Sequence, residues 1–364
     1  MNTSIKVVEI MAVKLSSIRR HPRHKIEAYP EPVRLKLLSV FIAVYASTLV
    51  TLSATAEATP TETTKIPTLV VMDTALDTSI PVIKSKLIHE VCILEWPSCP
   101  NGTKFMEGPG SSVLPITILK NNGFDHGTRM VSTAIAHNPN LKVLFIRIIG
   151  HTSSGLRQRT SPITLFDALQ WVYSNKDKYN VVAIAISQGS HEALYTTVSN
   201  YCPLTSIDML IDKLYSDNIP TFFPTGNERD KSKINWPACI PNAVAVGGFE
   251  NVGLDTPRPS KTSNYDKRLI DIWAEISWPV LNSGGETKKY SGTSVANQIA
   301  AARYVAVKVA RPSLTAAQTV SLIRSKATPL SSDLPPSIRT SFPHLNQDIL
   351  MFTLQTVLDL GRES

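Results

Sequence analysis

Apolar runs that alternate with helical patterns are the feature that most constrains the fold of this chain. The runs are short and mostly free of polar residues, which predicts strands buried on both faces, as in a parallel sheet. The segments between them repeat apolar residues with the period of an α-helix. The expected strands cover 67–72, 142–149, 181–186, 219–223, 243–246 and 269–273, and the expected helices cover 127–137, 163–175, 206–217, 294–309, 315–327 and 348–358. This order predicts an α/β fold with a doubly wound, mostly parallel sheet and helices on both faces.

Four polar side chains stand where such a sheet would place a functional site. Asp73 and Asn227 each follow an expected strand, whereas His126 and Ser294 lie at helix starts. In wound parallel sheets the site forms outside the carboxyl ends of the strands. Each residue alone is typical of a helix cap, a turn or a structural histidine. Together they supply a carboxylate, an amide, an imidazole and a hydroxyl, the groups that nucleophilic catalysis by serine requires.

Ser294 lies in the run Gly-Thr-Ser-Val-Ala at 292–296, which predicts a tight turn that opens a small-residue helix. Free backbone N–H groups and the positive end of the helix dipole favour negative charge beside a hydroxyl at that place. A serine that attacks a carbonyl needs this environment. A Ser or Thr before an alanine-rich helix is also a common N-cap. The catalytic interpretation therefore depends on the other three groups.

The same residues lie in ordered motifs that resemble those of the subtilase family, the subtilisin-like serine peptidases, over roughly residues 66–360. The matching segments are Val-Val-Met-Asp-Thr-Ala at 70–75, His-Gly-Thr at 126–128, Ile-Ala-Ile-Ser-Gln-Gly at 184–189, Thr-Gly-Asn-Glu at 225–228, Trp-Pro-Ala-Cys-Ile-Pro-Asn-Ala-Val-Ala-Val-Gly at 236–247 and Gly-Thr-Ser-Val-Ala at 292–296. The chain order Asp, His, Ser is also that of subtilisin. The resemblance implies a subtilisin-like three-layer fold and hydrolysis of peptide bonds through an acyl-enzyme.

The resemblance also implies a role for each residue of the expected site. His126 would take the proton of Ser294 and later give it to the leaving amine, while Asp73 fixes the tautomer of the imidazole. The side-chain amide of Asn227 and the backbone N–H of Ser294 would hold the oxyanion.

The resemblance implies that the substrate pairs with the enzyme as an added strand, which gives affinity with little demand on sequence. The expected substrate-binding residues are Ser187, Gln188, Gly189, Thr225 and Gly226. The floor of the specificity pocket is expected within the stretch 229–236.

Two positions depart from the family pattern. Ala75 replaces the usual glycine after the catalytic carboxylate, and Gln298 stands where proline is usual early in the serine helix. Without proline the helix start is expected to be slightly looser.

Two other functions stay open at this point. An α/β-hydrolase esterase would use Ser294 with Asp333 and His344, which follow in the order of that fold. It leaves the remaining three polar groups unexplained, and the segment before the serine is a poor buried strand. The other function is that of a non-catalytic binding protein on the subtilase fold. In that case the departures at Ala75 and Gln298 would mark the loss of catalytic activity.

Residues 1–58 are predicted to be a leader. The first 36 carry eight Lys or Arg and three Glu, so most of the formal charge of +8 lies there, and a nucleic-acid partner is not expected. An apolar stretch at 37–52 and the small-residue run at 53–58 complete the pattern of a secretory signal peptide. The alternative is that 37–52 stays as a membrane tether. An exported protein, secreted or periplasmic, is expected in either case.

A linker rich in Thr, Pro and Glu is predicted at 59–65, followed by the catalytic domain at 66–364. Asp73 lies only 15 positions after Ala58, which leaves no room for the inhibitory segment that many secreted relatives carry. Three explanations stay open: the chain matures differently, its start is shifted, or a separate inhibitor or chaperone restrains it. The expected partner in every case is a protein or peptide substrate.

The chain has four cysteines, none in a CXXC pair, which argues against a zinc site. An even number in an exported chain suggests disulfides. The pairs Cys92–Cys99 and Cys202–Cys239 are expected, with four buried free thiols as the alternative. No clear calcium motif is present, so no cofactor is expected.

Overall fold

A computed structural model describes residues 66–326, apart from 122, 159, 191–201, 203–204, 253–255 and 267–268, together with 328–329 and 343–344. All of them belong to one compact unit, Lys65–Ser364. The strands are β1 (Thr68–Asp73), β2 (Leu87–Ile93), β3 (Phe105–Glu107), β4 (Lys142–Arg147), β5 (Val181–Ile186), β6 (Thr221–Pro224), β7 (Ala243–Val252), β8 (Thr256–Pro259), β9 (Ile272–Glu275), β10 (Ser277–Leu281), β11 (Thr287–Ser291), β12 (Thr328–Pro329) and β13 (Pro343–His344). The helices are α2 (Pro81–Lys86), α3 (Ile116–Asn121), α4 (His126–His137), α5 (Pro162–Asn175), α6 (Ser206–Ser216), α7 (Thr293–Ala310) and α8 (Ala316–Lys326). The predicted leader, the linker, the helix at 348–358 and Asp333 lie outside the described residues.

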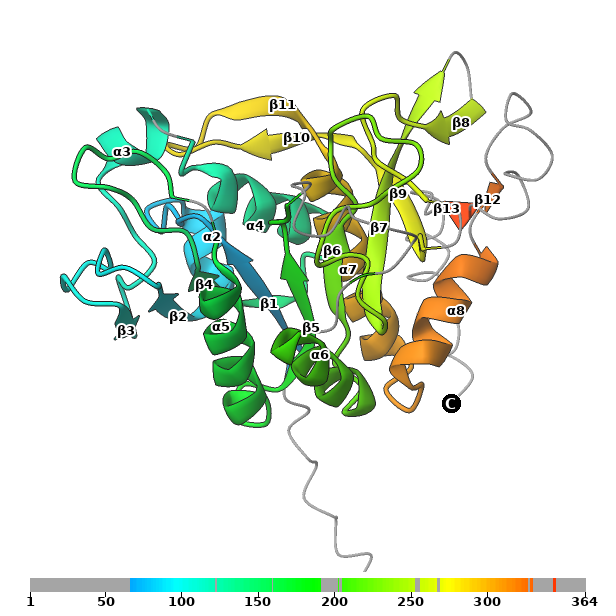
Figure 1. Ribbon diagram of the computed structural model, residues 1–364, viewed down its shortest axis with the longest axis horizontal. Helices are drawn as coiled ribbons and strands as arrows, with labels where there is room; N and C mark the ends of the chain where they lie inside the picture. Colours follow the sequence, from blue (N-terminus) through cyan, green and yellow to red (C-terminus); the bar gives the residue numbers. More distant parts are fainter. Residues whose placement is uncertain are drawn as a thin grey trace, which may run out of the picture. The chain divides into compact units, whose positions relative to one another are not determined.

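An eleven-stranded sheet forms the centre of the unit (Figure 1), in the order β12-β13-β9-β7-β6-β5-β1-β4-β2-β3, with β8 paired to β7. The strands from β9 to β2 along this path are parallel to their neighbours. Antiparallel pairs occur at β3, β8 and β12. The chain visits β2 and β4 on one side of β1 and then crosses to β5 on the other. Such a reversal opens a crevice at the carboxyl ends of the strands.

The first strand shows why these apolar runs lie in the centre of the sheet. Leu69 and Val71 face one hydrophobic core, whereas Val70 and Met72 face the other. Side chains alternate between the two faces of a strand, so a strand covered on both sides must be apolar at every position. The run ends where a carboxylate, that of Asp73, reaches the edge of the sheet.

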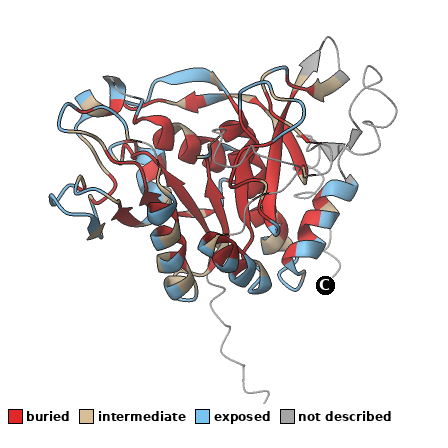
Figure 2. Cartoon of the chain, viewed as in Figure 1, coloured by how far each residue is buried: buried red, intermediate tan, exposed pale blue. Residues whose placement is uncertain are grey.

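Helices cover both faces of the sheet, as the sequence predicts (Figure 1). The apolar side chains of α5 and α6 belong to the core on one face, and those of α4, α7 and α8 to the core on the other. Buried residues accordingly fill the central strands and α7, while exposed residues lie on the outer surfaces of α5, α6 and α8 (Figure 2). The predicted α/β fold is therefore confirmed.

No strand or helix was predicted within the segment 92–123, and this is only partly correct. It contains the end of β2, the short β3 and one helix, α3. A separate antiparallel hairpin, β10 with β11, was not predicted either. β11 is mostly exposed and β10 is mostly half-buried, so neither has the continuous apolar run by which the central strands are recognised.

Both expected disulfides are present. Cys92 is bonded to Cys99 and Cys202 to Cys239, and no cysteine is free. The first closes a short loop after β2, and the second ties the segment before α6 to the segment before β7. Disulfides such as these form and persist in oxidising compartments.

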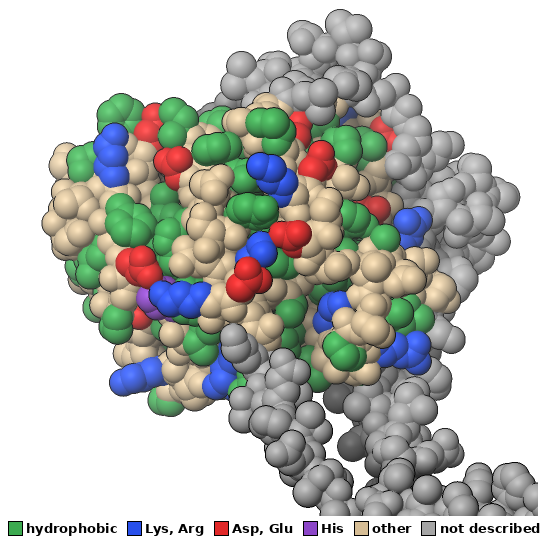
Figure 3. All heavy atoms as spheres, turned by 90° about the horizontal axis from the view of Figure 1, so that it is seen from below, with side chains coloured by type: hydrophobic (Ala, Val, Ile, Leu, Met, Phe, Trp, Pro, Cys, Tyr) green, Lys and Arg blue, Asp and Glu red, His purple; other side chains and the backbone are tan. Residues whose placement is uncertain are grey.

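Charged side chains of both signs are interspersed on the face seen in Figure 3, so the basic residues in that view do not form one patch. Within the described part of the chain, no helix combines the length and the hydrophobicity that a membrane span requires.

The buried His137, at the end of α4, is expected to make the stability of the fold sensitive to acid. Burial, and secondly the positive charge of Arg303, lower the pKa of His137 from 6.5 to about 4. The unfolded chain therefore takes up a proton near pH 6.5, whereas the folded chain takes it up only near pH 4. Stability should be unaffected above this window and should fall as the pH drops through it, by about 3 kcal/mol at most. Urea unfolding of the wild type and of His137→Gln at several pH values measures the difference. The account would be contradicted if the difference in unfolding free energy between the wild type and His137→Gln were the same at pH 7 and at pH 4.5.

Candidate active site

Asp73 and His126 are joined by a short hydrogen bond at the carboxyl end of β1. Nδ1 of His126 donates to Oδ1 of Asp73 at 2.8 Å, and the carboxylate is fully buried. The same oxygen accepts the backbone N–H of Thr74 at 2.7 Å and lies 3.4 Å from Nε2 of Gln188. With Nδ1 as the donor, Nε2 of the neutral imidazole is free to accept a proton.

The start of α4 is docked onto the end of β1, which places the imidazole beside the carboxylate. The hydroxyl of Thr74 donates to the carbonyl of Phe124 at 2.7 Å and accepts the N–H of Gly127 at 2.9 Å. A Cβ on Gly127 would lie 2.4 Å from the carbonyl oxygen of Ala75 and 2.7 Å from the ring of Phe145. Only glycine permits this approach, which explains why glycine follows the histidine.

Ser294 is the second residue of α7 and is 9% exposed. Gly292 caps the helix, and the carbonyl of Gly292 accepts the N–H of Val295 at 2.9 Å. The N–H of Ser294 is one of the first-turn donors that an α-helix leaves without a partner, and it lies at the positive end of the helix dipole. The strand before it, β11, is exposed and belongs to the separate hairpin. It is unlike the buried strand that precedes the serine of an α/β-hydrolase.

Three contacts bring Ser294 into the same region as the Asp73–His126 pair. The hydroxyl of Ser187 donates to the carbonyl of Ser294 at 3.3 Å, and the adjacent Gln188 reaches Asp73. The ring of Tyr290, four residues before Ser294, lies 5.9 Å from the imidazole. The hydroxyl of Ser294 makes no hydrogen bond within the described residues. Such bonds are often long or absent without substrate and tighten in the complex.

Asn227 follows β6 and faces the start of α7. Its Oδ1 accepts the backbone N–H of Thr293 at 2.9 Å and the Thr293 hydroxyl at 3.2 Å. These bonds use the amide oxygen and so fix the orientation of the amide plane. Nδ2 makes no hydrogen bond within the described residues, so two N–H donors are available beside the N–H of Ser294.

The expected substrate segment, Ser187 to Gly189, extends beyond the last residue of β5. Nε2 of Gln298 donates to the hydroxyl of Ser187 at 3.0 Å, and both side chains are buried. Gln298, which replaces the usual proline, therefore ties α7 to this segment. After Gly189, Ser190 pairs with Trp236 in an antiparallel bridge.

Thr225 and Gly226 lie across from that segment. The hydroxyl of Thr225 donates to the carbonyl of Asn264 at 2.7 Å, and Gly226 has a φ of +110°. A Cβ on Gly226 would lie 2.4 Å from Nδ2 of Asn264 and 2.5 Å from Cγ of Asn235. Asn235 belongs to the stretch in which the pocket floor was expected, and its Cβ is also 3.5 Å from the position of a Cβ on Gly189.

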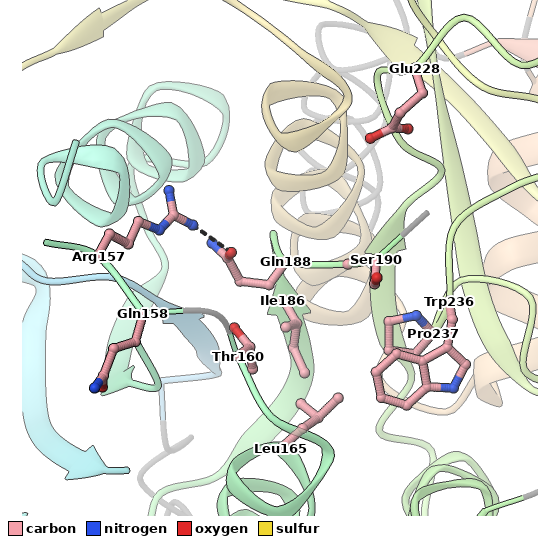
Figure 4. Close-up of a pocket in the computed structure, with 11 residues that line it drawn as sticks. Arg157, Gln158, Thr160, Leu165, Ile186, Gln188, Ser190, Glu228, Trp236 and Pro237 are labelled. Carbon is pink, nitrogen blue, oxygen red and sulfur yellow. Dashed lines mark hydrogen bonds between the residues drawn. The ribbon is translucent and has the colours of Figure 1, made fainter. Parts of the chain in front are cut away.

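A cavity of about 600 Å³ lies beside the segment Ser187 to Gly189 (Figure 4). Its apolar side is formed by Leu165, Ile186, Trp236 and Pro237. The other residues around it are Arg157, Gln158, Thr160, Gln188, Gly189, Ser190 and Glu228. Nη2 of Arg157 donates to Oε1 of Gln188 at 2.6 Å, so one amide contacts both this guanidinium and the buried carboxylate.

Among the described residues, no cluster of three or more His, Cys, Asp or Glu could hold a metal ion. The sequence-based expectation that no cofactor is needed stays a prediction.

The comparisons with known proteins identify the family and the fold of this chain. The model of the subtilase family matches residues 65–343. The subtilisin-like protease 2 of Trichophyton verrucosum is 38% identical over 95 residues, which are 25% of this chain and 21% of the relative. That of Arthroderma otae is 28% identical over 138 residues, which are 36% of this chain and 29% of the relative. The chain therefore spans less than a third of the length of these curated relatives.

Solved structures show the same fold at low identity. The structure of sphericase has a TM-score of 0.55 and 19% identity, and the match covers 72% of this chain and 83% of sphericase. The protease domain of PatA, solved as a mutant, has a TM-score of 0.58 and 17% identity, and the match covers 80% and 95% of the two chains. Because the family model covers most of the chain, this protein belongs to the subtilase family.

Sequence reasoning missed some residues that contact this site. Tyr290 lies close to His126, Arg129 contacts the ring of Tyr290, and Arg157 lies close to Gln188. None of the three belongs to a motif position with an expected role. Arg129 does stand three residues after His126 in a predicted helix, a spacing that places two side chains on one helix face.

Proposed function

We propose that this chain is an exported serine endopeptidase that hydrolyses peptide bonds through an acyl-enzyme. The observation that supports this most is the bond between Nδ1 of His126 and Oδ1 of Asp73, beside the helix start that carries Ser294. A carboxylate that orients an imidazole next to a serine hydroxyl is the arrangement of a nucleophile with its base.

The proposed reaction uses only groups of this chain and water. Ser294 Oγ attacks the carbonyl carbon of the scissile bond while Nε2 of His126 takes the hydroxyl proton. The tetrahedral intermediate collapses, and the same proton passes to the leaving amine. Water then attacks the ester while Nε2 of His126 takes its proton. The bond between the acyl carbon and Ser294 Oγ breaks, and the imidazolium returns the proton to Oγ. Asp73 keeps Nδ1 protonated and stabilises the imidazolium in both halves of the reaction. No cofactor takes part in these steps.

The oxyanion would be held by Nδ2 of Asn227 and by the N–H of Ser294. We expect Asn227→Ala to lower kcat by about 10²–10³, with little change in KM, because this donor acts on charge that develops only in the transition state; the magnitude is that of subtilisin. Steady-state kinetics on a peptide would measure this. Asn227→Asp keeps the acceptor for Thr293 but opposes the oxyanion, so it should be at least as impaired. An unchanged kcat in both variants would contradict the role.

The substrate would bind in extended form along Ser187, Gln188 and Gly189. Thr225 and Gly226 would flank the residue whose carbonyl is attacked. This is supported by the position of the segment beyond β5, next to both Asp73 and Ser294. Main-chain pairing of this kind tolerates many sequences, so side-chain preference would come from the surrounding pockets.

A fluorophosphonate probe and a peptide library test the proposal together. The probe should label Ser294 of the wild type, label His126→Ala far more slowly, and leave Ser294→Ala unlabelled. Library cleavage by the full chain would show endopeptidase activity and side-chain preference. If the folded chain is neither labelled nor active, it is a non-catalytic binding protein on this fold.

Export is proposed from the basic and apolar leader and is supported by two disulfides. Cleavage near Ala56 or Ala58 would release the chain, whereas an uncleaved 37–52 would tether it. Amino-terminal sequencing of the exported product decides between these two outcomes. Co-purification from the native host would reveal a separate inhibitor or chaperone.

A further inference from the structure

Arg129 lies one helical turn after His126 on α4 and makes contacts in three directions. Its Nη2 is paired with Oδ2 of Asp125 at 2.7 Å. Its Nε donates to Oδ1 of Asn282 at 2.8 Å, in the loop of the β10–β11 hairpin. The planar guanidinium fixes these two bonds in one geometry, which a lysine could not reproduce.

The third contact of Arg129 is an aromatic ring. Its Cζ lies 4.7 Å from the ring centroid of Tyr290, on β11. The same ring lies 5.9 Å from the imidazole of His126, at an interplanar angle of 76°. Tyr290 therefore lies between a cation and the proposed base. Both contacts have geometries in which aromatic rings attract their neighbours.

The imidazole of His126 has one hydrogen bond within the described residues, that of Nδ1 to Asp73. A ring held at one atom can still swing about that bond, which would move Nε2 away from Ser294. The edge-to-face contact with Tyr290 blocks one direction of this movement. Because a small misplacement of a reacting group slows a reaction strongly, such a contact affects the rate.

Tyr290 itself needs support, since β10 and β11 form a sheet separate from the central one. Arg129 provides support at the loop of the hairpin and at the ring of Tyr290 simultaneously. A second tie joins the hairpin to α4 without contacting that ring: the N–H of Leu281 donates to the hydroxyl of Ser132 at 3.0 Å.

We propose that Arg129 and Tyr290 are positioning residues that hold the imidazole of His126 in the orientation that accepts the proton of Ser294. Arg129 holds the ring of Tyr290, and that ring restrains the imidazole. The proposal rests on the proposed function, because it assigns these residues to the same reaction.

The test compares two readouts in the full chain. One is kcat and KM for a peptide, and the other is the second-order rate of Ser294 phosphonylation by a small fluorophosphonate. The reagent needs the base and the serine but has no peptide leaving group. We expect Arg129→Met and Tyr290→Leu to lower kcat and the phosphonylation rate by about the same factor, about tenfold or more, with KM changed less than about twofold. Tyr290→Phe keeps the ring and should retain most of both rates. The double variant should have nearly the same rates as Tyr290→Leu. Both substitutions act on the same series of contacts, from Arg129 through Tyr290 to His126, so their effects should not add.

Ser132→Ala is the matched control, because it loosens the hairpin elsewhere and should leave the phosphonylation rate unchanged. The proposal is overturned if this control slows phosphonylation as much as Arg129→Met does. It is also overturned if peptide cleavage falls through KM while phosphonylation is unchanged, since the pair would then bind the leaving part of the substrate. A wild-type chain that is not labelled overturns the proposed function and this proposal with it. A labelled wild type with unaffected variants overturns this proposal alone.

Discussion

Ser294→Ala is expected to lower kcat on the order of 10⁶-fold, the magnitude found in subtilisin, and to leave the fold intact. The rate is lost because no other group can form the acyl-enzyme. The fold is kept because the hydroxyl makes no hydrogen bond within the described residues, while the carbonyl that Ser187 contacts remains. Peptide hydrolysis measures the first expectation, and thermal unfolding measures the second. The melting temperature should change by no more than a few degrees.

Ser291→Ala is a suitable control for this substitution. Ser291 lies three residues earlier, is exposed, and has its hydroxyl bonded to that of Ser277 at 2.8 Å. Its removal should leave kcat within about twofold of the wild type, as is usual for surface substitutions. Wild-type turnover in Ser294→Ala would exclude this residue as the nucleophile. Loss of turnover in both variants would point to misfolding.

The fold could be predicted because its central strands are apolar on both faces. Each run at β1, β4, β5, β6 and β7 has the composition that a covered parallel strand requires, and the helices between them have clear periods. β2 was missed because it carries His89 and Glu90 within an otherwise apolar run. Glu90 is buried, but its carboxylate accepts N–H groups of Gly110 and Ser112 and the hydroxyl of Ser112. The sequence of β2 alone does not indicate that Glu90 is buried, because the groups that hydrogen-bond to its carboxylate lie in a loop about 20 residues away.

Parts of the site could be predicted for the same reason, since strand ends and helix starts are visible in a sequence. The bond between Asp73 and His126 joins two residues that were expected to meet, although 53 positions separate them. The contacts that hold the site are different in kind. Arg129 reaches a hairpin more than 150 residues away, and Gln298 bonds to Ser187 from α7. Such pairs depend on the packing of α4 and α7 under the hairpin, which no local pattern specifies.

Asp73→Asn should lower kcat by about 10⁴, with the fold retained. Oδ1 of Asp73 accepts both Nδ1–H of His126 and the N–H of Thr74. If the new amide keeps its oxygen there, the tautomer is preserved, but the charge that stabilises the imidazolium is lost, and the amide nitrogen takes the place of a buried oxygen without a hydrogen-bond partner. If the amide is flipped, its nitrogen donates to Nδ1 and forces the proton onto Nε2, which can no longer accept one. Both orientations impair the base, and kcat measured across the pH range tests this.

Asp208→Asn separates the loss of a base from the general cost of changing a buried carboxylate. Asp208 is also buried, but it lies in the capping box of α6, where it accepts the N–H of Thr205 at 2.8 Å. Its substitution should cost about 1 kcal/mol of stability and leave kcat within about twofold. Asp73→Asn should show the opposite pattern, a large loss of rate with a small loss of stability. If the two variants lost activity in proportion to stability, Asp73 would be a structural carboxylate and His126 would need another partner.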